Sequence, residues 1–216
     1  EFRRVLFRSD QDRVRKIRNK ESYILDVPSK DIVRVINKKK FEVSTKFDSL
    51  GKADVIIICV PTPLKRKYTP DISYILSAVR TIRRYLKKDT LIVLESTTYP
   101  GTTREVLLPA LNKTGLTVGD DFYLCFSPER VDPGNREWMI HNTPKVIGGI
   151  TPTCSAVGGA VYERFIDTVV RVSSVEAAEL TKILENTFRA VNIGLRSEEH
   201  TSELQSPDHL RMPSSA

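Results

Sequence analysis

Two hydrophobic patterns alternate along this chain. Short runs rich in β-branched residues, typical of strands buried on both faces, lie at residues 41–45, 53–60, 90–96, 121–127, 145–149 and 167–173, the first being the weakest. Longer segments with apolar residues at helical spacing lie at residues 29–39, 71–88, 102–113, 152–165 and 175–195. This alternation is typical of βαβ units. It predicts an α/β fold with a doubly wound, mostly parallel, Rossmann-like sheet.

The two ends of the chain do not follow this pattern. After Leu195 the helical periodicity stops without a Gly or Asn cap, and no Pro occurs before Pro207. One codon choice for residues 196–204, RSEEHTSEL, has a reverse complement that encodes residues 1–9, EFRRVLFRS. The shared segment resembles a short-read sequencing adapter, and a charged, disordered terminus would not explain the match. We therefore expect residues 1–9 and 196–216 to be adapter-derived and non-native, and the chain to be an internal fragment.

The net charge only slightly restricts the classes of binding partner that the sequence allows. The 216 residues carry a formal net charge of +7. The basic clusters, at residues 38–40, 65–67, 83–84 and 87–88, are short and are not interleaved with aromatic residues as a single-strand-binding surface would be. These clusters are better explained as solvent-exposed charged faces than as a nucleic-acid-binding surface. An anionic small-molecule substrate fits the excess of positive charge equally well. No segment reaches transmembrane length, so we expect no membrane partner.

Cysteine and histidine usage indicates neither a disulfide framework nor a metal site. Cys59, Cys125 and Cys154 are far apart, and an odd, scattered set fits a reducing cytoplasm. Cys59 and Cys125 lie in apolar strand-like runs, so we expect them to be small core residues. Only His141 lies between the two adapter-derived ends, which argues against histidine triads and zinc sites. The sequence therefore predicts a cytoplasmic protein without a metal.

Polar loops follow three of the predicted strands. PTPL, which contains Thr62, follows residues 53–60; STTYPGTT follows the next strand, and SPERVDPGN follows the third. In doubly wound sheets, ligands bind beyond the carboxyl ends of the strands, so the three loops together predict one shared crevice. The last helix adds Lys182 and Asn186 on one face, a pair that can stabilise an oxyanion. Spacing alone still favours a solvated lysine and a surface asparagine.

The chain resembles the UDP-glucose/GDP-mannose dehydrogenase family over nearly all of residues 10–195. The motifs that carry the resemblance are ADVIIICVPTPL, LIVLESTTYPGTT, FYLCFSPERVDPGN, TPKVIGGITP and AELTKILENTFRAVNI. Their order and length are highly specific, and SPERVDPGN after ESTTYPGTT is most similar to the branch that acts on UDP-N-acetylglucosamine. The resemblance divides the chain into a partial N-terminal NAD-binding domain, residues 10–174, and the start of a central helical domain, residues 175–195.

The resemblance also implies a reaction. Members of this family oxidise the C6 alcohol of a nucleotide sugar to a carboxylate with two NAD⁺, through an aldehyde and an enzyme thioester. Such enzymes supply uronic acids for surface polysaccharide, and the parent protein would be a homodimer through the central helix. The family pattern implies that Thr97 and Glu129 activate a water molecule. It implies that Lys182 and Asn186 stabilise the oxyanions formed in the reaction. Two further groups of residues follow from the motifs. Val60, Pro61, Thr62, Ser96, Thr97 and Glu129 would line the NAD site, while Glu129, Arg130, Val131, Asp132, Lys182 and Asn186 would approach the UDP-sugar.

Several departures from the family pattern qualify these expectations. The GxGxxG loop and the first strands of the sheet would lie upstream of Asp10, and the nucleophilic cysteine would lie in a later domain. A second glutamate that some members carry is replaced here by Pro133. We therefore expect this polypeptide itself to be inactive. The alternatives are a UDP-glucose or UDP-N-acetylmannosamine 6-dehydrogenase, a hydroxyacid dehydrogenase, and a non-enzymatic binding module with a basic face for nucleic acid.

Overall fold

The computed structural model describes residues 4–7, 10–24, 27–63, 69–130 and 141–205, with the backbone alone for residues 197–205. Its larger sheet has the order β3-β4-β5-β6-β7. The strands are β3 (Val55–Ile58), β4 (Thr90–Leu94), β5 (Phe122–Phe126), β6 (Lys145–Gly149) and β7 (Val169–Arg171). β3, β4 and β5 are parallel, β6 is antiparallel to β5, and β7 is parallel to β6. The predicted mostly parallel α/β sheet is thereby confirmed.

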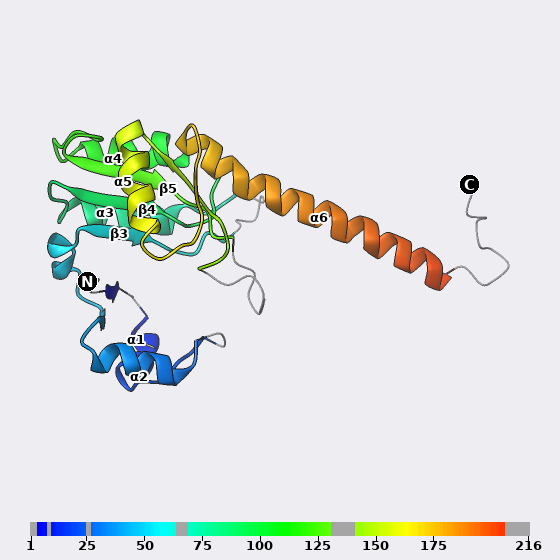
Figure 1. Cartoon of the computed structure of the whole chain (residues 1–216), viewed down its shortest axis with the longest axis horizontal. Coiled ribbons are helices and arrows are strands. Elements are labelled where there is room, and N and C mark those ends of the chain that lie inside the picture. Colours follow the sequence, from blue (N-terminus) through cyan, green and yellow to red (C-terminus); the bar gives the residue numbers. More distant parts are fainter. Residues whose placement is uncertain (1–3, 8–9, 25–26, 64–68, 131–140, 206–216) are drawn as a thin grey trace.

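Helices cover both faces of this sheet (Figure 1). One face carries α3 (Ser73–Arg83), the π-helical segment η2 (Thr102–Leu107) and α4 (Leu108–Asn112), and the other carries α5 (Pro152–Tyr162). Ile92 and Leu94 of β4 face the first group, whereas Leu91 and Val93 face α5. Because side chains alternate along a strand, β4 is buried at every position, as its continuous apolar run predicts.

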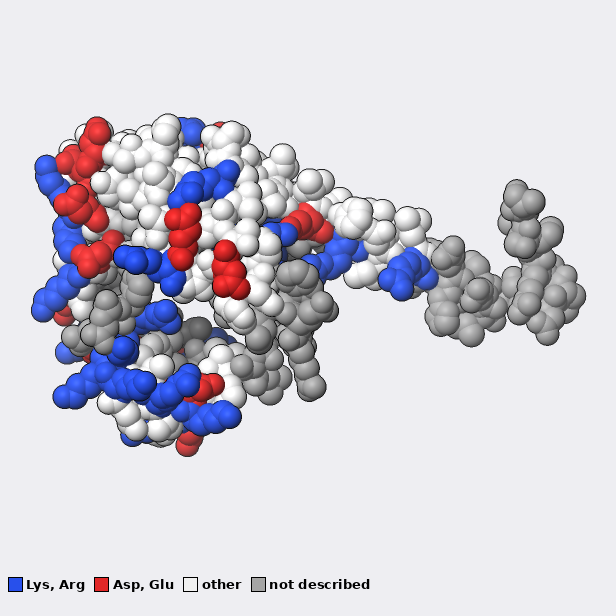
Figure 2. Space-filling view, viewed as in Figure 1, with Lys and Arg blue, Asp and Glu red and all other residues white. Residues whose placement is uncertain are grey.

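A smaller lobe contains the first elements of the chain. β1 (Arg4–Phe7) pairs in parallel with β2 (Phe41–Ser44), and α1 (Gln11–Arg18) and α2 (Ser29–Asn37) pack on this pair. The 3-10 turn η1 (Asp48–Lys52) leads on to β3. The sequence predicted neither β1, which lies within residues 1–9, nor α1. Figure 2 shows many of the Lys and Arg side chains gathered on this lobe. Arg13, Arg15 and Arg34 each form an ion pair with a nearby aspartate there.

The last helix, α6 (Val175–Gln205), begins against the sheet and then leaves it (Figure 1). Val175 and Ala178 are buried in the main core, whereas every described residue from Asn186 to Arg196 is exposed. The helix was predicted to end at Leu195, and the structure continues it to Gln205. No Gly or Pro interrupts residues 196–205, so the backbone meets no strong helix breaker before Pro207.

The close contact between β6 and α5 gives a test of the fold. A Cβ at Gly149 would lie 2.3 Å from the Ser155 nitrogen and 2.8 Å from the Thr151 carbonyl oxygen. Gly149→Ala should therefore lower the free energy of unfolding by about 1–3 kcal/mol, the usual cost of overpacking. Urea unfolding would measure the loss. Gly194→Ala is the matched control, because nothing lies within 4 Å of Gly194 on exposed α6. Equal stability of the two variants would contradict this packing.

Candidate functional site

The carboxyl ends of β3, β4 and β5 meet at one edge of the sheet, and hydrogen bonds join them there. The Glu95 nitrogen donates to the Ile58 carbonyl at 2.9 Å, and the Ser127 nitrogen donates to the Leu94 carbonyl at 3.0 Å. The loops that follow the three strands therefore leave from neighbouring points. In an open α/β sheet this edge is where ligands bind, so the predicted shared crevice falls in the expected place.

The residues predicted to line a cofactor lie at the first two strand ends. The Val60 nitrogen donates to the Ser96 hydroxyl oxygen at 2.8 Å, and Ser96 is buried. The Ser96 hydroxyl thus joins the two loops. Thr97, next along the chain, is exposed, as is Pro61, and Thr62 is half-buried. The structure therefore brings this group together and leaves Thr97, not Ser96, facing solvent.

The loop after β5 is attached to α6. The Lys182 Nζ donates to the Glu129 carbonyl oxygen at 2.5 Å, which joins two of the predicted catalytic residues. Arg130 contacts the Glu185 carboxylate at 2.6 Å and donates to the Pro144 carbonyl at 2.8 Å. Asn186 is exposed, and within the described part of the chain no hydrogen bond joins it to another predicted residue. Val131 and Asp132 lie outside the described residues.

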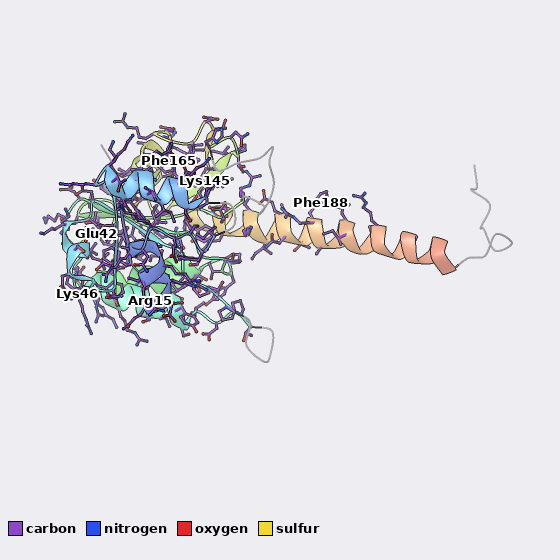
Figure 3. All side chains as sticks on the ribbon, turned by 90° about the horizontal axis from the view of Figure 1, so that it is seen from below. Arg15, Glu42, Lys46, Lys145, Phe165 and Phe188 are labelled. Carbon is purple, nitrogen blue, oxygen red and sulfur yellow. The ribbon has the colours of Figure 1, made fainter. Side chains whose placement is uncertain are left out.

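A group of polar side chains lies at the same edge, and sequence reasoning found Glu129 in it but missed Glu95, Lys145 and Tyr162. We call Cys59, Glu95, Glu129, Lys145 and Tyr162 the sheet-edge cluster. The Lys145 Nζ lies 2.8 Å from a Glu95 carboxylate oxygen and 3.8 Å from a Glu129 carboxylate oxygen. Lys145 is labelled in Figure 3, where it lies within the body of the domain near the start of α6. The Tyr162 hydroxyl donates to Glu95 at 2.6 Å.

The environment of Glu95 explains its ion pair. Its side chain is 14% exposed and that of Lys145 is 11% exposed, so each charge would be costly without the other. Desolvation, followed by the charge of Glu95, raises the pKa of the Tyr162 phenol far above its usual range. Tyr162 therefore remains a hydrogen-bond donor to Glu95. A strand-end glutamate beside a hydroxyl-rich turn was the one signal in the sequence for this cluster.

The prediction that Cys59 belongs to the core is wrong, whereas Cys125 is buried as predicted. Cys59 is exposed because β3 is an edge strand of the described sheet, where Ile57 is also exposed. The Cys59 thiol contacts a Glu95 carboxylate oxygen at 3.4 Å. Desolvation, then the charge of Glu95, raises the pKa of Cys59 to about 12. With its pKa raised in this way, the Cys59 thiol is held in its protonated form at neutral pH.

Comparison with known proteins identifies the class of protein that this fold and edge define. The family model for the UDP-glucose/GDP-mannose dehydrogenase family, NAD binding domain, matches residues 4–166. That match covers most of the chain. The chain belongs to the UDP-glucose/GDP-mannose dehydrogenase family, and the matching residues correspond to its NAD-binding domain.

Individual relatives agree with this assignment. A UDP-N-acetyl-D-glucosamine 6-dehydrogenase of Pseudomonas aeruginosa is 34% identical over 198 residues, which are 90% of this chain and 46% of the relative. A UDP-N-acetyl-D-mannosamine dehydrogenase of Pyrococcus horikoshii is 35% identical over 188 residues, 86% of this chain and 44% of the relative. A solved structure of the UDP-N-acetylmannosamine dehydrogenase from Pyrococcus horikoshii superimposes with a TM-score of 0.86 at 32% identity, covering 91% of this chain and 47% of that one. The chain spans about half the length of the curated relatives it matches.

Two features are absent from the residues that the structure describes. None of their helices is both long and apolar enough to span a bilayer. No group of three or more His, Cys, Asp or Glu side chains among them is arranged to hold a metal ion.

The sheet-edge cluster predicts how Cys59 reacts. Glu95→Gln removes the negative charge that raises the pKa of Cys59, so more thiolate is present at a fixed alkaline pH. Alkylation of Cys59 should then become faster, by about tenfold for each unit that the pKa falls. Lys145→Met should slow it, because Lys145 lowers the pKa of Cys59. Peptide mapping after iodoacetamide treatment would separate Cys59 from buried Cys125 and Cys154. A rate unchanged in both variants would contradict the cluster.

Proposed function

We propose that the protein to which this chain belongs is a cytoplasmic, NAD-dependent nucleotide-sugar 6-dehydrogenase. It oxidises the C6 alcohol of a UDP-sugar to the uronic acid with two NAD⁺, for surface polysaccharide biosynthesis. UDP-N-acetylglucosamine is the substrate that we favour. The observation that carries the proposal is the contact between Lys182 of α6 and the Glu129 loop, because it joins residues of two family motifs at the ligand-binding edge of the sheet.

The chemistry of these residues suits the proposed reaction. The carboxylate of Glu129 is half exposed, so it can accept a hydrogen bond from a water molecule. Thr97 is exposed on the neighbouring loop and offers a hydroxyl for the same water. The Lys182 ammonium can stabilise negative charge that develops on the sugar oxygen, and Asn186, four residues further along α6, can donate a second hydrogen bond. Arg130, Val131 and Asp132 would complete the UDP-sugar contacts.

The described residues at β3 and β4 fit a dinucleotide. Because the Ser96 hydroxyl already joins the two loops, the backbone of Val60 is held in place while Pro61 and Thr62 remain accessible. A proline-containing loop of fixed shape suits the flat ring systems of NAD⁺. When bound, the cofactor accepts the hydride. The residues that would line it are Val60, Pro61, Thr62, Ser96, Thr97 and Glu129. The role of the protein residues is to orient the sugar and to hold water.

UDP-N-acetylmannosamine is the second candidate substrate. Relatives named for it match this chain as well as relatives named for UDP-N-acetylglucosamine do, at 35% and 34% identity. The two sugars differ only in configuration at C2, so a few contacts near the acetamido group decide between them. UDP-glucose would require that this group has no binding partner.

An activity test can separate the segment from the rest of the enzyme. We predict that the 216-residue polypeptide alone does not turn over UDP-sugars, because the relatives that carry the activity are about twice as long. A chimera in which residues 10–195 replace the matching segment of the Pseudomonas aeruginosa relative should form NADH from UDP-N-acetylglucosamine. In it, Lys182→Met should lower kcat by roughly 10²–10³-fold, as for the loss of an oxyanion donor.

The control in this experiment is Lys88→Met. Lys88 pairs with Asp121 at 2.8 Å, before β4 and β5 and hence at the opposite edge of the sheet. Its loss should leave kcat unchanged. A folded chimera without activity on any UDP-sugar would contradict the proposed function, and full activity of the Lys182 variant would contradict the role of Lys182. Turnover by the 216-residue chain would refute its predicted inactivity.

We also propose that α6 pairs with α6 of a second copy. A stripe of exposed apolar residues follows one side of the helix: Leu180, Leu184, Phe188, Val191 and Leu195. Figure 3 shows Phe188 on the part of α6 that projects from the domain. At 100° per residue this stripe lies opposite Lys182 and Asn186. A dimer would therefore cover the stripe without covering the proposed site, and a single copy leaves a large apolar surface in water.

Phe188→Glu tests the dimer. A charge at this position, which is 71% exposed in one copy, should shift the protein from dimer to monomer in light scattering at micromolar concentration. Ile193→Glu is the control, because Ile193 is 61% exposed but lies on the opposite side of the helix. A dimer that survives Phe188→Glu, or a wild-type monomer, would argue against pairing through the stripe.

A further inference from the structure

Glu179 is a fully buried carboxylate that the proposed chemistry does not use. It lies in the second turn of α6, with 0% of the residue exposed. One oxygen accepts a hydrogen bond from the Gly101 nitrogen at 2.6 Å. The other accepts from the Thr103 nitrogen at 2.8 Å and from the Thr103 hydroxyl at 2.7 Å. We call these three hydrogen bonds the α6 anchor.

The donors of the α6 anchor lie at the start of the helix that follows β4. The first N–H groups of a helix have no partner within it, and Gly101 precedes η2 with a φ of +96°. A carboxylate from α6 therefore caps this helix, and the helix dipole favours its negative charge. Burial nevertheless raises the pKa of Glu179 above its usual range, because desolvation outweighs the three hydrogen bonds. The three hydrogen bonds are directional, so together they constrain where the Glu179 carboxylate can lie.

A second contact fixes α6 from a different direction, about 100° around the helix from Glu179. A Cβ at Gly148 of β6 would lie 2.3 Å from the Ser174 carbonyl oxygen and 3.0 Å from the Ala178 Cβ. The backbone of β6 thus touches the start of α6 directly. With Ala178 against β6 and Glu179 against η2, α6 can neither rotate nor slide without breaking one contact.

This fixed position determines where Lys182 lies. Lys182 is three residues after Glu179, so it projects from the same side of α6 one turn further on. There it reaches the Glu129 carbonyl oxygen. Every described side chain of α6 from Asn186 to Arg196 is exposed, so the buried contacts that hold the helix in place all lie before Asn186. We propose that Glu179 is a positioning residue that sets Lys182 and Asn186 at the carboxyl edge of the sheet, an inference that rests on the function proposed above.

The anchor has a consequence for binding. The N–H groups of Gly101 and Thr103 follow a parallel strand at the edge where doubly wound folds bind anions. Since Glu179 occupies them, a phosphate of the cofactor or substrate does not bind at this helix start. Phosphate recognition falls to other donors.

Glu179→Ala in the 216-residue chain tests the inference without substrate or cofactor. It should raise hydrogen exchange in residues 175–186 and 101–103, and acetylation of Lys182 should increase at least several-fold by mass spectrometry. Glu179→Gln keeps one carbonyl acceptor and should restore part of the protection of Lys182. The matched control is Glu176→Ala, one turn earlier, because Glu176 is paired with Arg104 at the surface. It should leave Lys182 unchanged.

Outcomes of this test separate the anchor from the catalytic proposal. Unchanged acetylation and exchange in Glu179→Ala would overturn the role of Glu179, whatever the activity of the chimera. If Glu179→Ala does not fold, Thr103→Val tests the role of Glu179 instead. This variant removes one hydroxyl donor to Glu179 and keeps the shape of the side chain. Its far-ultraviolet circular dichroism should match the parent while Lys182 acetylation rises. Unchanged acetylation in that variant would equally overturn the inference.

Discussion

The contact between Glu179 and the start of η2 connects the two parts of the molecule that the proposed site needs. The sheet supplies the strand ends with their loops, whereas α6 supplies Lys182 and Asn186. Apolar burial of Val175 and Ala178 brings α6 to the sheet but does not by itself fix its rotation, because the hydrophobic effect is not directional. Hydrogen bonds to the Glu179 carboxylate are directional, and they make one helix position preferable to its neighbours.

Around that position, ionic contacts add smaller constraints. Glu176 pairs with Arg104, and Glu185, about two and a half turns further along α6, pairs with Arg130 as the helix leaves the domain. Partly exposed ion pairs contribute little stability, typically about 0–1 kcal/mol. Arg130 also donates to the Pro144 carbonyl, and so links the loop after β5, the start of β6 and α6 at one point.

Much of this architecture could be predicted from hydrophobic pattern, because a buried parallel strand has to be apolar at every position. The central strands β4 and β5 show this directly, because nearly all of their residues are apolar and buried. Lys145 could not be assigned in the same way. In a parallel sheet the first residue of a strand lies at the edge opposite the ligand crevice. β6 is antiparallel to β5, with Phe126 opposite Gly148, and continuing this register brings Lys145 opposite Glu129. The reversal depends on a long connection between strands that leaves no periodic signal.

The contacts that fix α6 also could not be predicted from the sequence, for a different reason. Lys182 and Asn186 were found through a family motif, whereas Glu179 looks like any helix-surface glutamate until its burial is known. Strand β1 was missed because residues 1–9 were excluded from the pattern, and α1 was missed because only Val14 and Ile17 of its eight residues are buried and apolar. Cys59 was misassigned because an apolar run does not reveal which strand lies at the edge of a sheet.

The distribution of charge sharpens what recognition at the strand ends requires. Among the described residues there, Lys145 pairs with Glu95 and Arg130 pairs with Glu185, while Lys182 donates to the Glu129 backbone carbonyl. With the Glu129 carboxylate, these residues carry three positive and three negative side chains. Exposed lysines and arginines gather on the α1 and α2 lobe (Figure 2). A UDP-sugar is therefore not held at this edge by a general excess of positive charge. It has to be recognised by individual donors at fixed positions, and the position of Lys182 follows from the burial of Glu179.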